Sequence, residues 1–129
     1  MFLPRYLKYS KRHTWVKAED GLGRVGLSDY AQEMLQEVLF VHLPEPGTEV
    51  KYLEPFGSIE SIKAVQKLCS PVTGTVEKVN EDLEFDPGLV NNSPYDKGWM
   101  ILVRLQDESE IDTHMSAEEY KEWIKEHPD

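Results

Sequence analysis

The sequence predicts a mostly β fold, a sandwich or small barrel, with a helix at the C-terminal end. Three observations lead to this prediction. Runs of β-branched and aromatic residues are short, turn signals interrupt them along most of the chain, and a helix-start pattern directly precedes the last apolar stripe. With 129 residues, 40% of them hydrophobic and 29% charged, the chain has the size of one domain with a true core.

The expected strands follow one another with few residues between them. They cover residues 6–9, 14–18, 23–27, 38–43, 49–51, 57–61, 64–69, 75–79 and 99–105. Ser28 is a predicted N-cap for a short helix ending at about Leu35. Residues 44–47 read Pro-Glu-Pro-Gly and predict a turn. Residues 81–98 contain two prolines and two glycines, which predicts an ordered loop with about one helical turn.

The C-terminal helix has the clearest start signal in the chain. Ser116 and Glu119 form a capping box, and Tyr120, Trp123 and Ile124 make an apolar stripe after it. An amphipathic helix is therefore predicted over about 117–126.

Lys63 is a single lysine inside a β-like run, residues 57–65. Such a lysine is either buried with a shifted pKa or projects from a tight bend. Pro55 and Pro71 lie eight residues before and after it, and each opens a β-like stretch containing a glycine. This pattern favours a hairpin with the amine at its tip, either an ordinary exposed lysine or an attachment point.

The charge of the chain is uneven. The net charge is −10, and residues 81–129, with fourteen acids and four Lys or Arg, supply all of it. An acidic protein of this kind is not expected to bind nucleic acid. The acidic part is either a solvated face or a surface that steers the protein toward basic partners.

The predicted compartment is the cytoplasm, or the mitochondrial matrix if the source is eukaryotic. No apolar run approaches the ~20 residues needed to cross a membrane, and the N-terminus lacks an apolar signal segment. The single cysteine, Cys69, excludes an internal disulfide, suits a reducing compartment and is expected to be a small buried thiol.

Two sets of residues that could indicate other chemistry are not supported by the sequence around them. Residues 21–26 spell G-x-G-x-x-G, but an acidic pair precedes them and a β-like run follows, so a tight hairpin turn explains the glycines better than a nucleotide site. The four histidines and Cys69 are scattered without paired metal-ligand spacing, so no metal is expected. No catalytic constellation stands out, and the chain is predicted to be a non-enzyme, or an enzyme component whose reactive group is added afterwards.

Seven blocks of sequence, in order, resemble the H proteins of the glycine cleavage system, which are lipoyl carriers. The resemblance covers about residues 6–125. The matching blocks are His13-Thr14-Trp15-Val16, residues 25–32, residues 43–47, Glu60-Ser61-Ile62-Lys63-Ala64, residues 70–74, Val79-Asn80 and residues 91–100.

The resemblance implies a barrel-sandwich hybrid, a single lipoyl-carrier domain over 1–129 made of two small sheets with short helices. Its lipoyl hairpin would span about 57–69, with lipoic acid joined by an amide to Lys63 and with Ser61, Ile62 and Ala64 flanking it. Glu60 and Gly74 match positions that help the lipoylating enzyme recognise the hairpin, and we expect Gly74 to set the turn opposite the tip.

The family also implies the partners and the cycle. A pyridoxal-phosphate glycine decarboxylase loads an aminomethyl group onto the arm, a tetrahydrofolate-dependent aminomethyltransferase removes it, and dihydrolipoamide dehydrogenase reoxidises the dithiol. The carrier itself would be non-catalytic, and a monomer is expected because it must visit several active sites.

Four positions match the family's cleft for the loaded arm: Thr14, Leu27, Met34 and Lys67. Family members commonly have Glu where Thr14 stands, and some have His and an acid where Met34 and Lys67 stand. An acid would hold a protonated amine, whereas Lys67 would oppose it. The resemblance thus predicts lipoylation together with an altered shelter for the amine.

Three rival functions follow from these observations. An H-like lipoyl carrier for another pathway, such as lipoate-dependent sulfur oxidation or lipoyl relay, is favoured by the altered cleft. A biotin carrier would have the same hairpin design, but biotinyl domains usually place Met beside the lysine, where this chain has Ile62 and Ala64. A plain interaction module would carry no prosthetic group.

Overall fold

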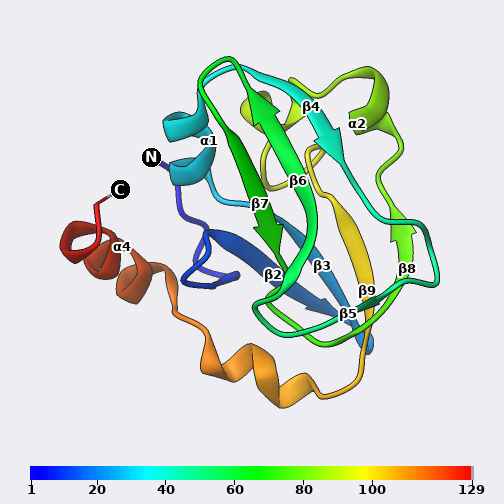
Figure 1. Ribbon diagram of the computed structural model, residues 1–129. Helices are drawn as coiled ribbons and strands as arrows, with labels where there is room; N and C mark the ends of the chain where they lie inside the picture. The colour runs from blue at the N-terminus through cyan, green and yellow to red at the C-terminus, as the bar shows by residue number, and fades with distance from the viewer. Residues whose placement is uncertain (129) are drawn as a thin grey trace.

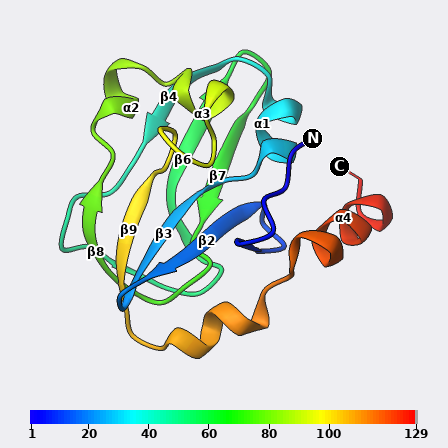
Figure 2. The same cartoon turned by 180° about the vertical axis from the view of Figure 1, so that it is seen from behind.

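The computed structural model describes residues 1–128, which form two antiparallel sheets facing each other (Figures 1 and 2). The six-stranded sheet has the order β1-β2-β3-β9-β8-β5, and the three-stranded sheet has the order β4-β6-β7. The strands are β1 (Lys8–Tyr9), β2 (Thr14–Glu19), β3 (Leu22–Leu27), β4 (Val38–His42), β5 (Glu49–Val50), β6 (Pro55–Ser61), β7 (Val65–Cys69), β8 (Gly74–Val79) and β9 (Ile101–Leu105). All nine expected strands are present within the described chain, and the mostly β fold class is confirmed.

The motif at residues 21–26 is a hairpin and the strand that follows it. Asp20 and Gly21 turn between β2 and β3 with φ of 51° and 80°, the left-handed values of a tight two-residue hairpin turn. The turn explains Gly21 only. Gly26, the third glycine of the motif, lies within β3, where a Cβ would come within 2.5 Å of the Trp15 ring, so close packing explains this glycine.

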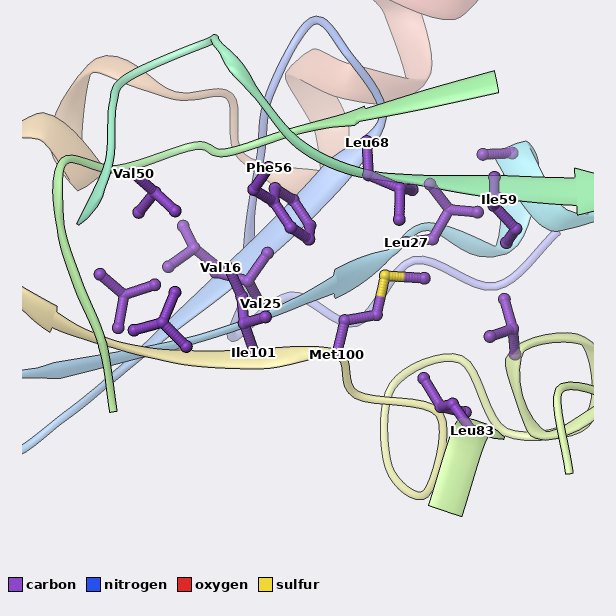
Figure 3. Close-up of a cluster of buried hydrophobic side chains, with 14 of the residues drawn as sticks. Val16, Val25, Leu27, Val50, Phe56, Ile59, Leu68, Leu83, Met100 and Ile101 are labelled. Carbon is purple, nitrogen blue, oxygen red and sulfur yellow. The ribbon is translucent and has the colours of Figure 1, made fainter. Parts of the chain in front are cut away.

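The main hydrophobic core fills the space between the two sheets. Figure 3 shows Ile59 and Leu68 of the three-stranded sheet pointing toward side chains of the other sheet, including Val25 and Ile101. Ile59, Val25 and Ile101 have no exposed surface. This packing makes the β6–β7 hairpin one wall of the core, so its backbone is held along most of its length.

The short helices only partly match the sequence prediction. Helix α1 (Asp29–Leu35) begins after Ser28, whose hydroxyl accepts a hydrogen bond from the Ala31 amide, as a predicted N-cap should. Residues 81–98 form two helices, α2 (Asp82–Phe85) and α3 (Leu89–Asn92), where about one turn was expected. A 3₁₀ helix at Glu108–Thr113 was not predicted. Helices α2 and α3 each bury one apolar side chain, Leu83 and Val90.

Helix α4 (Ala117–Glu126) has the predicted bounds, and both capping-box hydrogen bonds between Ser116 and Glu119 are present. It packs on β1 through Tyr120, whose ring stacks on Tyr9 with centroids 4.8 Å apart. The Tyr120 hydroxyl lies 2.7 Å from His13 Nδ1 and 2.8 Å from Ser28 Oγ. A small second cluster of buried residues thus fixes the C-terminal helix to the start of the chain.

Candidate functional site

Lys63 lies in the bend between β6 and β7, at the tip of the hairpin at the top of Figure 1. It is exposed, as are its neighbours Ile62 and Ala64. None of the ion pairs formed within residues 1–128 involves Lys63. The amine is therefore open to a reacting partner, on a segment whose two strands are held by the core.

One hydroxyl group organises the Lys63 bend. Ser61 Oγ accepts hydrogen bonds from the amides of Lys63 and Ala64, each at 3.1 Å, and donates to the Ala64 carbonyl at 3.2 Å. The Ser61 amide donates to the same carbonyl at 2.9 Å. A serine that bonds its own backbone in this way favours a turn over a continued strand.

The bend is also tied to the rest of the protein. The Ile62 amide donates to the carbonyl of Glu37, in the connection between α1 and β4, at 3.0 Å. This contact crosses from the hairpin to a separate segment and restrains the tip. Sequence reasoning did not find Glu37, because only its backbone takes part and its side chain gives no signal.

The outer face of the three-stranded sheet carries Glu60. Phe40, Glu60 and Val65 are cross-strand neighbours, so their side chains point to the same face, and the buried Ile59 points to the other. Phe40 is 58% exposed and Val65 is 71% exposed. The Glu60 carboxylate lies 3.3 Å from His42 Nε2. A carboxylate and two exposed apolar side chains thus lie beside the Lys63 tip.

Gly74 does not set a turn, so that structural expectation was wrong. It opens β8, is buried and pairs with Val50 on one side and Leu105 on the other. A Cβ at this position would lie 2.1 Å from the Arg104 carbonyl oxygen. The close approach of the β9 backbone, rather than backbone freedom in a turn, explains the need for glycine here.

A histidine side chain contacts the backbone at the base of the hairpin, just after the end of β7. His114 Nε2 lies 2.6 Å from the Pro71 carbonyl oxygen and donates to it, since a carbonyl can only accept. The His114 ring stacks on Tyr52 at 5.1 Å. Burial lowers the pKa of His114 from its ordinary value, while the Pro71 carbonyl and Glu110 act in the opposite direction. The neutral imidazole is therefore the form that this packing favours.

The four positions matched to an arm cleft differ in burial. Thr14 and Leu27 are buried, at 0% and 1% exposure, and the Thr14 hydroxyl donates to the Cys69 carbonyl at 2.9 Å. Met34 is half-buried on α1. Lys67 is exposed on β7 and lines a cavity with residues that the sequence reasoning did not select. Cys69 is a buried free thiol, as expected.

None of the helices in the described part of the chain is long and apolar enough to cross a membrane. Within residues 1–128, no group of three or more His, Cys, Asp or Glu side chains is placed to hold a metal ion.

Comparison with known proteins gives consistent results over nearly the whole chain. The family model described as "Glycine cleavage H-protein" matches residues 7–127. The chain is 50% identical over 126 residues to the glycine cleavage system H protein of Bacillus velezensis, covering 98% of this chain and 99% of that protein. It is 52% identical over 124 residues to the one from Halalkalibacterium halodurans, covering 96% and 97%.

Solved structures give the same result. The crystal structure of a glycine cleavage system H protein from Mycobacterium marinum matches with a TM-score of 0.88 at 31% sequence identity. The match covers 95% of this chain and 99% of that one. The similarity therefore extends over both sheets and is not confined to the hairpin.

Proposed function

Because this chain belongs to the glycine cleavage H-protein family, we propose that Lys63 is the residue to which its lipoyl group is attached. The chain is a carrier of the glycine cleavage system rather than an enzyme. When bound, a lipoyl group supplies a dithiolane that can accept a transferred group on sulfur and cycle between disulfide and dithiol. The amide bond would also remove the positive charge of the lysine.

The observation that carries the proposal is the exposed, unpaired amine of Lys63 on a fixed bend. An amine must be free of a carboxylate partner to be acylated readily, and Lys63 takes part in none of the ion pairs of the described chain. The Ser61 hydrogen bonds and the Ile62 anchor give a modifying enzyme one bend shape to recognise. Recognition of a preformed bend loses less conformational entropy than recognition of a flexible loop.

Recognition by the lipoylating enzyme would use the face beside the tip. Glu60 offers a negative charge to a basic enzyme surface, and the exposed Val65 and Ile62 offer apolar contact. Gly74 would act indirectly, because it lies inside the six-stranded sheet and lets β9 approach β8. We expect Gly74 substitutions to reduce lipoylation through the fold rather than through lost contact with the enzyme.

Membership of the glycine cleavage system implies the partners of a shuttling arm. We propose that the arm on Lys63 visits a pyridoxal-phosphate glycine decarboxylase, a tetrahydrofolate-dependent aminomethyltransferase and dihydrolipoamide dehydrogenase. The protein's own residues would supply the rigid base, the reach and a high effective concentration. A monomer leaves the tip free to enter each active site. Acidic residues concentrated in 81–129 would speed encounter with basic partner surfaces.

The test is glycine–bicarbonate exchange in a reconstituted system. The lipoylated protein, mixed with the glycine decarboxylase of its own host, should support exchange of label between bicarbonate and glycine. The Lys63→Arg variant should not, although its positive charge and fold are kept, while Lys78→Arg should behave as wild type. A lipoylated protein that supports no exchange would contradict the proposal and point to another lipoyl-dependent pathway.

A further inference from the structure

A second candidate site lies away from the Lys63 tip, between the edge strand β7 and helix α4. A cavity of about 660 Å³ is found there. Its walls include Lys11, Arg12 and His13 from the β1–β2 connection, Lys67 from β7, and Trp123 and His127 from the end of the chain. In Figure 1 this is the region between the dark green β7 and the red helix at the left.

The charge of this cavity is opposite to that of the protein. The whole chain has 24 acids and 14 Lys or Arg, yet no Asp or Glu of residues 1–128 lines the cavity. Lys11, Arg12 and Lys67 are exposed and take part in none of the ion pairs found in that part of the chain. Three cations gathered on a concave surface repel one another and focus a positive potential, which an anion would neutralise.

The walls of the cavity are held in place by contacts between distant segments. The Thr14 hydroxyl joins β2 to the Cys69 carbonyl on β7, and His13 Nδ1 contacts the Tyr120 hydroxyl on α4. His13 and Leu53, which both line the cavity, have φ of 70° and 61°. Left-handed backbone is disfavoured for such side chains and persists only where the surroundings impose it.

An aromatic wall adds an apolar surface. The rings of Trp123 and His127 stack with centroids 4.5 Å apart, and Trp123 also lies 5.7 Å from the His13 ring. A ligand whose charged end meets the cations would place a less polar part, where it has one, against these rings.

We propose that this cavity binds a small oxyanion, a carboxylate, sulfonate, sulfate or phosphate group. The Arg12 guanidinium would bind the oxyanion through paired N–H groups, and Lys11 and Lys67 would add point charges. Lys67 on β7 is four residues after Lys63 and at most ~14 Å from it along a fully extended chain. An arm on Lys63 whose end carries an added oxyanion group is therefore one source. A free anion in solution is the other source.

The first experiment uses the unmodified protein, so it does not depend on the function proposed for Lys63. Sodium sulfate replaces sodium chloride stepwise at constant ionic strength, and the amide and indole signals of the protein are followed by NMR. Sulfate should shift the signals of Arg12, Lys67 and the Trp123 indole in a saturable way. Lys67→Glu should weaken binding roughly tenfold, the equivalent of ~1.4 kcal/mol. The matched control Lys78→Glu, an exposed strand lysine on the other sheet, should leave affinity within about twofold of wild type, since its charge lies outside the cavity.

Shifts that spread over all basic residues without saturation, or equal weakening by Lys67→Glu and Lys78→Glu, would overturn the site. Either result would mean general screening by the anion rather than binding in the cavity.

The second experiment distinguishes the two sources and rests on lipoylation of Lys63. In a Cys69→Ser background, both thiols of the reduced arm are alkylated, with loss of iodide, by iodoacetate, which adds a carboxylate to each sulfur, or by iodoacetamide, which adds a neutral amide of similar size to each. If the arm is the source, only the carboxylate-bearing arm should shift the cavity signals and exclude sulfate. If both arms leave sulfate binding unchanged, the site serves a free anion. Failure to lipoylate the protein would count against the proposed function alone, because the sulfate titration stands without it.

Discussion

Removal of the Ser61 hydroxyl should loosen the Lys63 bend by about 1 kcal/mol. This oxygen accepts from two amides at 3.1 Å and donates to one carbonyl at 3.2 Å. Net hydrogen-bond contributions are ~0.5–1.5 kcal/mol each, and these three are long and exposed, so each lies at or below the low end of that range. In Ser61→Ala the backbone bond from residue 61 to Ala64 remains, so the bend should persist but open more often.

Amide hydrogen exchange is the direct assay of that opening. A change of about 1 kcal/mol corresponds to roughly fivefold faster exchange at the Lys63 and Ala64 amides. Urea denaturation should show that the free energy of global unfolding falls by the same amount or less, because the core contacts are unchanged. The initial rate of enzymatic lipoylation should fall by up to the same factor.

Ser58→Ala is the matched control, since Ser58 lies on the same strand and its hydroxyl makes none of the hydrogen bonds found within residues 1–128. It should leave exchange at the bend and the lipoylation rate unchanged. If Ser61→Ala exchanges as slowly as wild type at the Lys63 and Ala64 amides, the hydroxyl does not organise the bend and the reasoning is refuted.

Three further predictions concern the scaffold around the hairpin. Gly74→Ala should destabilise the protein by ~3 kcal/mol, because the new Cβ meets β9 backbone that no rotamer change can move. Gly88→Ala, whose new Cβ would have its nearest contact at 3.5 Å, should stabilise the protein by ~0.5 kcal/mol, and equal urea midpoints for the two variants would contradict this reasoning. Burial lowers the pKa of His114, so below about pH 6.5 the unfolded state binds more protons than the folded state, and the free energy of unfolding should fall as the pH drops toward the folded pKa. His114→Gln should flatten this dependence of stability on pH, and an unchanged slope would show that another group causes it. Tyr120→Phe should cost ~2 kcal/mol, seen as a lower Tm, because the buried Ser28 and the half-buried His13 both lose its hydroxyl; an unchanged Tm would mean that these hydrogen bonds contribute no net stability.

Local signals in the sequence predicted the parts of the fold that depend on local chemistry. Helix α4 was predicted with its correct bounds because Ser116 and Glu119 cap it within four residues. The exposed position of Lys63 followed from the prolines on either side and from the run around it. Both are short-range effects, in which neighbouring residues decide the backbone.

Elements that depend on tertiary contact were less predictable. Helices α2 and α3 are four residues each, too short to show a 3.6-residue period, and each buries one apolar residue in the main core. Only residues 8–9 of the expected strand 6–9 pair with β2, and Tyr6 is 67% exposed with Lys17 over its ring.

The candidate site likewise contains residues that one stretch of sequence predicts and residues that only the fold brings together. Lys63 and Glu60 lie within one hairpin, so a single stretch of sequence suggested them. Thr14 was matched to a cleft by position in the chain, yet its hydroxyl is used inside the structure to join β2 to β7. The cavity beside Lys67 joins residues 11–13 with residues 123 and 127, which lie far apart in the sequence, so no local pattern predicts it.

The most direct measurement of the central claim is the intact mass of the protein after incubation with a lipoylating enzyme and lipoate. We predict a single added lipoyl group, found by peptide fragmentation on Lys63, absent from Lys63→Arg and present in Lys67→Arg. A protein that gains no mass, or one that gains the same mass in Lys63→Arg, would contradict the claim that this exposed lysine is the attachment point.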